Sequence, residues 1–255
     1  MQGCERSITL KGSHLARLRQ FVGEDMRAEA GGHIDIANTR GELAQLTYRI
    51  GHMNAHANHG GFEASWHSHP EAVYKACPAG AKQVLAMPSP SDIFAALYQH
   101  IHNPAENQVH LVPTREGVYA IDFTPAYVAA AKPRMAESGE FETGLREGVQ
   151  RLLNRYLCHG PGVASIHDPR ASLDDMVAAA TAALIADTRG LSVPLTGKPG
   201  GIIVQFAPWG HDLVLEGCLR VRHGKVRVHT HHTHGPEVAY AHPSSDQIEL
   251  VNPFA

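Results

Sequence analysis

The chain has 255 residues and a formal net charge of −3, and 43% of its residues are hydrophobic. This length suits one domain with an appendage or two small domains, and the apolar fraction suffices for a core but not for a membrane protein. The charge gives no general reason to expect nucleic acid, because binding domains of that kind usually carry a basic face. No apolar run approaches the roughly 20 residues of a spanning helix, and the N-terminus lacks a secretory pattern.

In chain order, the pattern "SHLARLRQFVGEDMRAEA" predicts a helix over residues 13–30, since its apolar residues recur at helical spacing. Ser13 is the expected N-cap, and the pair Gly31-Gly32 is expected to end the helix. Alternating patterns then predict strands at 33–37, 42–50 and 62–66.

Beyond an irregular connection, residues 92–102 predict a helix with one apolar stripe, and residues 108–114 and 117–123 predict a hairpin. The sequence pattern changes from mixed strand and helix to mostly helix after about residue 124. Residues 125–157 and 172–188 are mostly helical in pattern, with Pro133 expected to break or kink the first helix. Strand patterns return at 201–208, 212–223 and 225–231.

These elements predict an α/β protein in three parts. Residues 1–125 are expected to form the main domain, residues 126–190 a helical segment, and residues 191–255 a small β-rich region rich in histidine.

The four cysteines are far apart and never form a C-x-x-C pair. Isolated cysteines in a chain of this size are typical of reduced thiols, which predicts a cytoplasmic protein. Cys77 is expected to be a plain small residue, although a role as ligand of an additional metal is open. The cysteines are Cys4, Cys77, Cys158 and Cys218.

Histidine is abundant, at 19 residues, and two histidines stand one residue apart in "WHSHP". Side chains two apart on a strand share a face, so His67 and His69 can direct two imidazoles at one point. A catalytic zinc site typically has three protein ligands and an open position for water. Asp92, at the start of a predicted helix, is the candidate third ligand. Glu29, beside the two glycines, is the candidate general base.

The ordered set "EAGGHI", "WHSHP" and "PSPSD" resembles the JAMM (MPN+) zinc metalloprotease family, of the deubiquitinase-like prokaryotic type. The resemblance covers roughly residues 10–125 and implies a cytidine-deaminase-like mixed sheet flanked by helices. It implies that His67, His69 and Asp92 bind Zn²⁺. It also implies that Glu29 is the general base that returns a proton to the leaving amine, and that Ser89 stabilises the oxyanion.

The family resemblance further implies a reaction and a partner. The expected reaction is hydrolysis of an isopeptide bond between the C-terminus of a ubiquitin-like protein and a lysine, so the expected partner is that protein or its conjugate. Two alternatives stay open. One is a catalytically idle scaffold that binds a protein, and the other is a zinc amidohydrolase or peptidase with substrates unrelated to ubiquitin.

One feature departs from the family pattern. Nineteen residues, 70–88, separate His69 from Ser89, where the family usually has a much shorter connection. The additional residues, within the long insert 71–87, are expected to lie beside the metal as a lid or a substrate-reading segment. Loop-closure entropy grows slowly with length, so an insert of this kind is compatible with the assignment.

Simpler roles exist for the same residues. The two histidines could be half-exposed strand residues, and Glu29 could be a solvated residue in the last turn of a helix. Ser89 could be a turn residue, and Ser91 is the expected N-cap of the following helix. Glu63, in phase with the histidines, could orient a ligand imidazole.

A second motif near the C-terminus combines His232, His234 and Asp246 behind a strand pattern. Its aspartate stands at the wrong spacing from Ser244, and Glu216 is the nearest upstream candidate base. The preferred interpretation is a His-rich metal-binding or surface hairpin, followed by a degenerate second module of the same type.

Overall fold

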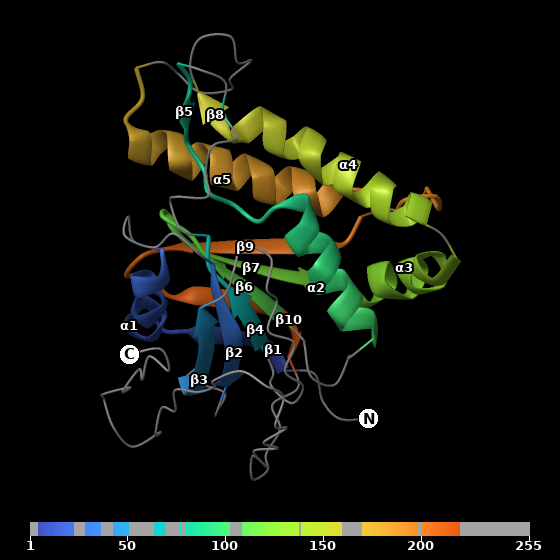
Figure 1. The fold of residues 1–255 in the computed structure, drawn as a ribbon, viewed down its shortest axis with the longest axis horizontal. Coiled ribbons are helices and arrows are strands. Elements are labelled where there is room, and N and C mark those ends of the chain that lie inside the picture. Colours follow the sequence, from blue (N-terminus) through green and yellow to red (C-terminus); the bar gives the residue numbers. More distant parts are fainter. Residues whose placement is uncertain are drawn as a thin grey trace.

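The computed structural model describes residues 5–22, 29–36, 43–50, 64–69, 77, 80–102, 109–137, 139–159, 170–197 and 200–219. Its centre is a mixed six-stranded sheet in the order β3-β2-β4-β6-β7-β9, flanked by helices (Figure 1). The α/β class expected from the sequence is therefore confirmed. The strands are β2 (Ala30–Ile36), β3 (Leu43–Ile50), β4 (Ala64–His67), β6 (Val109–Pro113), β7 (Gly117–Phe123) and β9 (Ile202–Pro208).

The pairing in the sheet is antiparallel except between β4 and β6, which run parallel. The connection between these two parallel strands contains helix α2 (Pro90–His102), as expected for a crossover between parallel strands. Within the described residues there are also two small antiparallel sheets, each of two strands. They pair β1 (Glu5–Leu10) with β10 (Leu213–Leu219), and β5 (Lys82–Gln83) with β8 (Cys158–His159).

The two faces of the sheet pack against different layers. On β7, Val118 and Ala120 join one buried cluster and Tyr119 and Ile121 join the other, which is the alternation expected of a strand buried on both faces. One layer contains helices α2, α3 (Pro125–Glu137), α4 (Gly139–Tyr156) and α5 (Leu173–Gly190). Figure 1 shows α4 and α5 side by side across that face.

The opposite face packs against the N-terminal helical turns and the β1–β10 pair. Trp66 of β4 is fully buried there, with its ring centroid 4.9 Å from that of Phe21. The short helix α1 (Gly12–Leu15) and the 3-10 helix η1 (Ala16–Phe21) contribute Leu15 and Leu18 to this cluster.

The first predicted helix is wrong in three respects. Its observed part is α1 followed by η1, and the N-cap position is Lys11 rather than Ser13, with the Gly12 N–H of the first turn bound by Asp212 Oδ1 at 2.9 Å. The two glycines do not end a helix, because they lie inside β2. Residues 23–28 are outside the described part of the chain.

The three predicted parts share layers of the structure. The change of character after residue 124 is visible as α3, α4 and α5. One buried cluster nevertheless runs from Val84 to Val204, and β9 is a strand of the central sheet. Pro133 lies inside α3, which continues to Glu137. The predicted boundaries therefore separate kinds of secondary structure, and the core crosses both of them.

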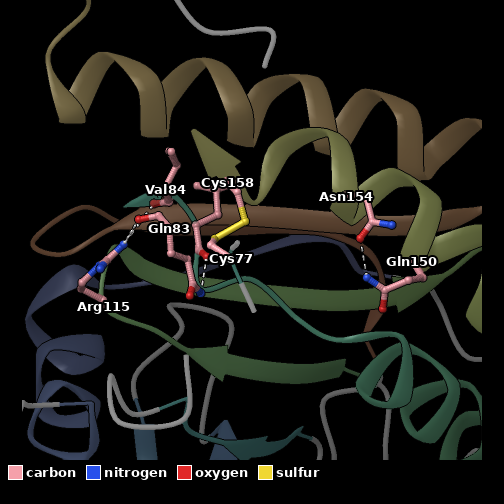
Figure 2. The surroundings of a disulfide bond; sticks show 8 residues. Cys77, Gln83, Val84, Arg115, Gln150, Asn154 and Cys158 are labelled. Carbon is pink, nitrogen blue, oxygen red and sulfur yellow. Dashed lines mark hydrogen bonds between the residues drawn. A yellow bond between two sulfur atoms is a disulfide. The ribbon is translucent and has the colours of Figure 1, made fainter. Parts of the chain in front are cut away.

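The cysteines differ from the expectation. Cys77 and Cys158 form a disulfide, so the prediction of isolated, reduced thiols is wrong at these two positions. Figure 2 shows the bond at the end of α4, beside the carbonyl oxygens of Gln83 and Val84 that accept from Arg115. The spacing could not show this pair, because 81 residues separate its members. No helix within the described residues is long and apolar enough to cross a membrane.

Candidate metal centre

The two histidines are positioned by the strands on either side of β4. His67 is the last residue of β4, and the chain continues in extended form because Ser68 N–H donates to the Ala30 carbonyl at 2.6 Å and His69 N–H donates to the Pro113 carbonyl at 2.9 Å. The β-like path keeps His67 and His69 on one side of the chain, as their spacing predicted.

A glycine allows β2 to approach β4 closely at this point. Gly31 pairs with His67, and a Cβ atom at Gly31 would lie 3.1 Å from the Trp66 carbonyl oxygen and 3.3 Å from the His67 Cβ. The close approach explains why a glycine stands inside a strand.

Asp92 lies in the first turn of α2, on the helix that crosses from β4 to β6. Ser89 precedes Pro90, the first helical residue, and acts as the cap: its Oγ accepts from Asp92 N–H at 3.3 Å. In return, Asp92 Oδ2 accepts from Ser89 N–H at 2.6 Å. This reciprocal pair is a capping box with proline at the first helical position. The expected cap, Ser91, is wrong, since that side chain accepts from Arg146 instead.

The three side chains converge on one point in the interior. His67 Nε2 lies 3.1 Å from Asp92 Oδ1, His69 Nε2 lies 3.0 Å from Asp92 Oδ2, and the two Nε2 atoms are 3.1 Å apart. All three side chains are buried, and one ligand atom from each lies within 4.8 Å of the others. This group could hold a metal ion, and it is the set of ligands that the sequence motif identified.

The buried cluster favours a negatively charged Asp92 carboxylate beside a positive charge. Burial opposes ionisation of Asp92, but the charges and hydrogen bonds of His67 and His69 outweigh it and hold the Asp92 pKa well below its usual range. Burial also opposes the imidazolium of His69, and there the Asp92 carboxylate prevails and raises the His69 pKa to about 9. A cation is therefore favoured at this point, whether it is a proton or a metal ion.

Both imidazoles are held at their outer nitrogens as well. His69 Nδ1 lies 3.1 Å from the Ala86 carbonyl oxygen, and His67 Nδ1 lies 2.6 Å from His110 Nε2. Outer partners of this kind orient metal-binding histidines and set which nitrogen carries the proton. The sequence reasoning missed His110. Its signal is a polar residue inside the apolar strand β6. Glu63, the residue considered for the orienting role, lies outside the described residues.

Glu29 immediately precedes β2 and is half-buried, so it is not the solvated residue of a last helical turn that the simpler alternative described. Burial raises the Glu29 pKa, His67 and His69 lower it, and Asp92 raises it further. These interactions place the Glu29 carboxylate within electrostatic range of all three members of the cluster. Ser89, the other predicted catalytic residue, lies against Asp92 through the capping box.

The described part of the long insert is anchored and reaches the site through its backbone. Cys77 is bonded to Cys158, β5 pairs with β8, and Val84 N–H donates to the Leu157 carbonyl at 2.7 Å. Ala86 then supplies the carbonyl next to His69, and its N–H donates to Glu116 Oε1 at 2.6 Å. Cys77 is thus neither a metal ligand nor a plain small residue. Residues His232, His234 and Asp246 lie outside the described residues.

Comparison with known proteins adds no relative: no protein-family model, curated protein or solved structure matches this chain. The site is therefore interpreted from its own chemistry.

Proposed function

We propose that this chain is a zinc-dependent metallopeptidase of the JAMM (MPN+) type that hydrolyses a peptide or isopeptide bond. The observation that carries the proposal is the buried convergence of His67, His69 and Asp92. Glu29, within electrostatic range of all three, supports it further. The four residues come from three separate segments, and the resemblance named each of them.

The donor set supports zinc as the metal. Two imidazole nitrogens and one carboxylate oxygen leave a fourth tetrahedral position open, which is the arrangement of catalytic zinc sites. A 2-His-1-carboxylate set also suits non-haem iron(II). The family resemblance favours zinc, and metal analysis distinguishes the two.

In the proposed reaction, a bound zinc ion would supply a hydroxide nucleophile near neutral pH, because it lowers the pKa of its water to about 7. Glu29 takes the water's proton and returns it to the leaving amine. Its raised pKa suits a group that must both accept and donate near neutrality. Ser89 donates its hydroxyl hydrogen to the developing oxyanion, while its Oγ accepts from Asp92 N–H.

The resemblance also supplies the proposed substrate and setting. The substrate is a ubiquitin-like protein joined through its C-terminus to a lysine, and the setting is the cytoplasm. The disulfide weighs against the cytoplasmic part, because such bonds persist mainly in oxidising compartments. An amidohydrolase acting on other substrates would use the same residues, so the choice of substrate is decided by assay.

The test is metal content combined with cleavage. We expect one zinc per parent chain, loss of that zinc in His67→Ala/His69→Ala, and retention in the control His100→Ala/His102→Ala, whose histidines lie near the end of α2. The variant His232→Ala/His234→Ala should also keep it. Glu29→Gln should keep zinc and lose at least about a hundredfold in cleavage, since general-base catalysis typically contributes 10²–10⁴.

Each other outcome is decisive. Unchanged zinc in His67→Ala/His69→Ala would overturn the site, and zinc that follows His232 and His234 would move the chemistry to the C-terminal motif. Iron in place of zinc would replace hydrolysis with redox chemistry. Bound zinc without cleavage of an isopeptide-linked ubiquitin dimer, or of any member of a peptide amide panel, would favour the idle scaffold.

A further inference from the structure

A chain of three side chains leads from the candidate metal centre into the sheet. His67 Nδ1 lies 2.6 Å from His110 Nε2, and His110 Nδ1 lies 2.7 Å from Ser65 Oγ. The rings of His67 and His110 stack, with centroids 4.8 Å apart and planes 29° from parallel. The outer partner of a ligand histidine is usually a carboxylate, a backbone carbonyl or water. Here it is a second imidazole.

The sheet register builds this arrangement. Ser65 and His67 are two residues apart on β4 and share a face, and the parallel pairing of β4 with β6 places His110 opposite Ser65. The β6 residues on either side, Val109 and Leu111, face the other buried cluster. His110 is therefore directed at the site by strand alternation.

Metal binding fixes the direction of both hydrogen bonds. His67 Nε2 faces Asp92 and His69, so a metal ion there requires the lone pair of Nε2, and the ring proton must be on Nδ1. His67 Nδ1–H then donates to His110 Nε2. His110 Nε2 must be unprotonated to accept, so the His110 proton is on Nδ1 and is donated to Ser65 Oγ.

We propose that His110 is a positioning residue of the metal centre, which holds His67 in its metal-binding tautomer and orientation, with Ser65 fixing the tautomer of His110 in turn. This inference rests on the proposed metal binding by His67. Because the relay is neutral, it orients the ligand without adding a negative charge. The site then retains more of the metal's positive charge than it would with a carboxylate partner.

The experiment measures zinc affinity by competition with a chromogenic chelator, on the full chain. Loss of an outer partner typically costs 10–100-fold in metal affinity, so we expect about that loss in His110→Ala. His110→Gln should stay within a few-fold of the parent, because its amide oxygen can accept near the position of Nε2. Ser65→Ala should lose less than His110→Ala. His100→Ala is the matched control: His100 lines the same small pocket as His110, but it faces Asp122 and is not a member of the His67, His69 and Asp92 group.

A second measurement separates positioning from simple support of the fold. Nitrogen-15 NMR of the imidazoles in the zinc-loaded parent should show the proton of both His67 and His110 on Nδ1. In His110→Ala we expect the His67 signals to broaden or shift, while the free energy of unfolding of the zinc-free chain changes far less than the affinity.

The inference is overturned if His110→Ala binds zinc with the parent's affinity, or if His110→Gln folds but is as weak as His110→Ala. A parent chain that binds no zinc overturns both this inference and the proposed function. Affinity, rather than cleavage, is the readout, so a chain that binds zinc without cleaving overturns the proposed function alone.

Discussion

Asp122, at the end of β7, is a buried carboxyl group outside the metal centre. Its Oδ1 accepts from Phe123 N–H at 2.7 Å and lies 3.8 Å from His100 Nδ1 of α2. Burial raises the Asp122 pKa to about 7 against the lowering effect of the Phe123 hydrogen bond. Burial also lowers the pKa of His100. Both facing groups are therefore favoured in their neutral forms.

This shift predicts a pH-dependent stability. In the unfolded chain Asp122 loses its proton near pH 3.8, but in the folded chain it keeps the proton up to about pH 7. Proton binding by Asp122 therefore stabilises the folded state fully below pH 3.8, and this stabilisation is lost as the pH rises through the folded-state pKa of about 7. We expect Asp122→Asn, which stays neutral, to gain a few kcal/mol relative to the parent between pH 4 and pH 8, at about 1.4 kcal/mol for each pKa unit. Urea unfolding of the variant and the parent at pH 4 and pH 8 measures this gain. A difference in the free energy of unfolding that is the same at both pH values would contradict the prediction.

At the scale of residues, the sequence predicts the candidate metal ligands better than the groups that lie against them. His67, His69 and Asp92 stand in short motifs whose spacing carries their geometry, so the cluster could be predicted. His110 could not, because its contact with His67 exists only through the parallel pairing of β4 with β6. Nor could the Ala86 carbonyl, which belongs to the backbone and leaves no mark in the sequence.

At the scale of elements, the hairpin of β6 and β7 depends on one glycine. Thr114 N–H donates to the Gly117 carbonyl at 2.7 Å, and Trp209 Nε1–H reaches the carbonyls of Thr114 and Arg115, each at 3.0 Å. A Cβ atom at Gly117 would lie 2.2 Å from the Ala207 carbonyl oxygen, which is backbone of the neighbouring strand β9. A side chain cannot be accommodated there unless β7 and β9 separate.

Gly117→Ala is therefore expected to lower the free energy of unfolding by at least about 2 kcal/mol, through overpacking at a site that cannot relax. Gly139→Ala is the control, since nothing lies within 4 Å of a Cβ atom built there. It should change stability by no more than about 0.5 kcal/mol, as surface substitutions usually do. Chemical denaturation of both variants compares them, and equal stability would contradict the account of the hairpin.

The elements that could be predicted are those in which the apolar pattern of the sequence agrees with the faces that are buried in the fold. α2, the β6–β7 hairpin and β9 are of this kind, because their apolar periodicity matches the faces that they bury. The first helix is the opposite case. Gly31 has the local signature of a helix end, but its actual constraint is the approach of β4, and that tertiary contact decides in favour of a strand.

At the scale of the whole molecule, the disulfide ties the insert to the end of α4. Cys77 and Cys158 lie 81 residues apart, so the bond closes a long loop of the unfolded chain. Removing it in Cys77→Ser/Cys158→Ser should lower the free energy of unfolding by about 2–4 kcal/mol. Denaturation of the variant, beside the parent with and without reductant, measures this. Equal free energies of unfolding for the variant, the parent and the reduced parent would show that the disulfide does not stabilise the fold.

The same variant should keep its zinc affinity within a few-fold. The Ala86 carbonyl beside His69 is also held by the Ala86 N–H bond to Glu116 and by the Arg115 bonds to the Gln83 and Val84 carbonyls (Figure 2). Chelator competition tests this. A large loss of affinity would show that the disulfide itself sets the position of the insert. Neither outcome could be read from the cysteines alone, whose spacing suggested unpaired thiols.

The pairing of β1 with β10 limits when this part of the chain can fold during synthesis. Lys11 and Gly12, just after β1, bind Asp212, just before β10, and about 200 residues separate them. Ribosomes add about 5–20 residues per second, so β1 emerges about 10–40 s before its partner. Throughout that interval the layer over Trp66 cannot close, because Leu213 and Leu215 of that cluster have yet to be synthesised. A nascent chain that has passed β1 therefore carries this strand without its partner until residues 213–219 have been made.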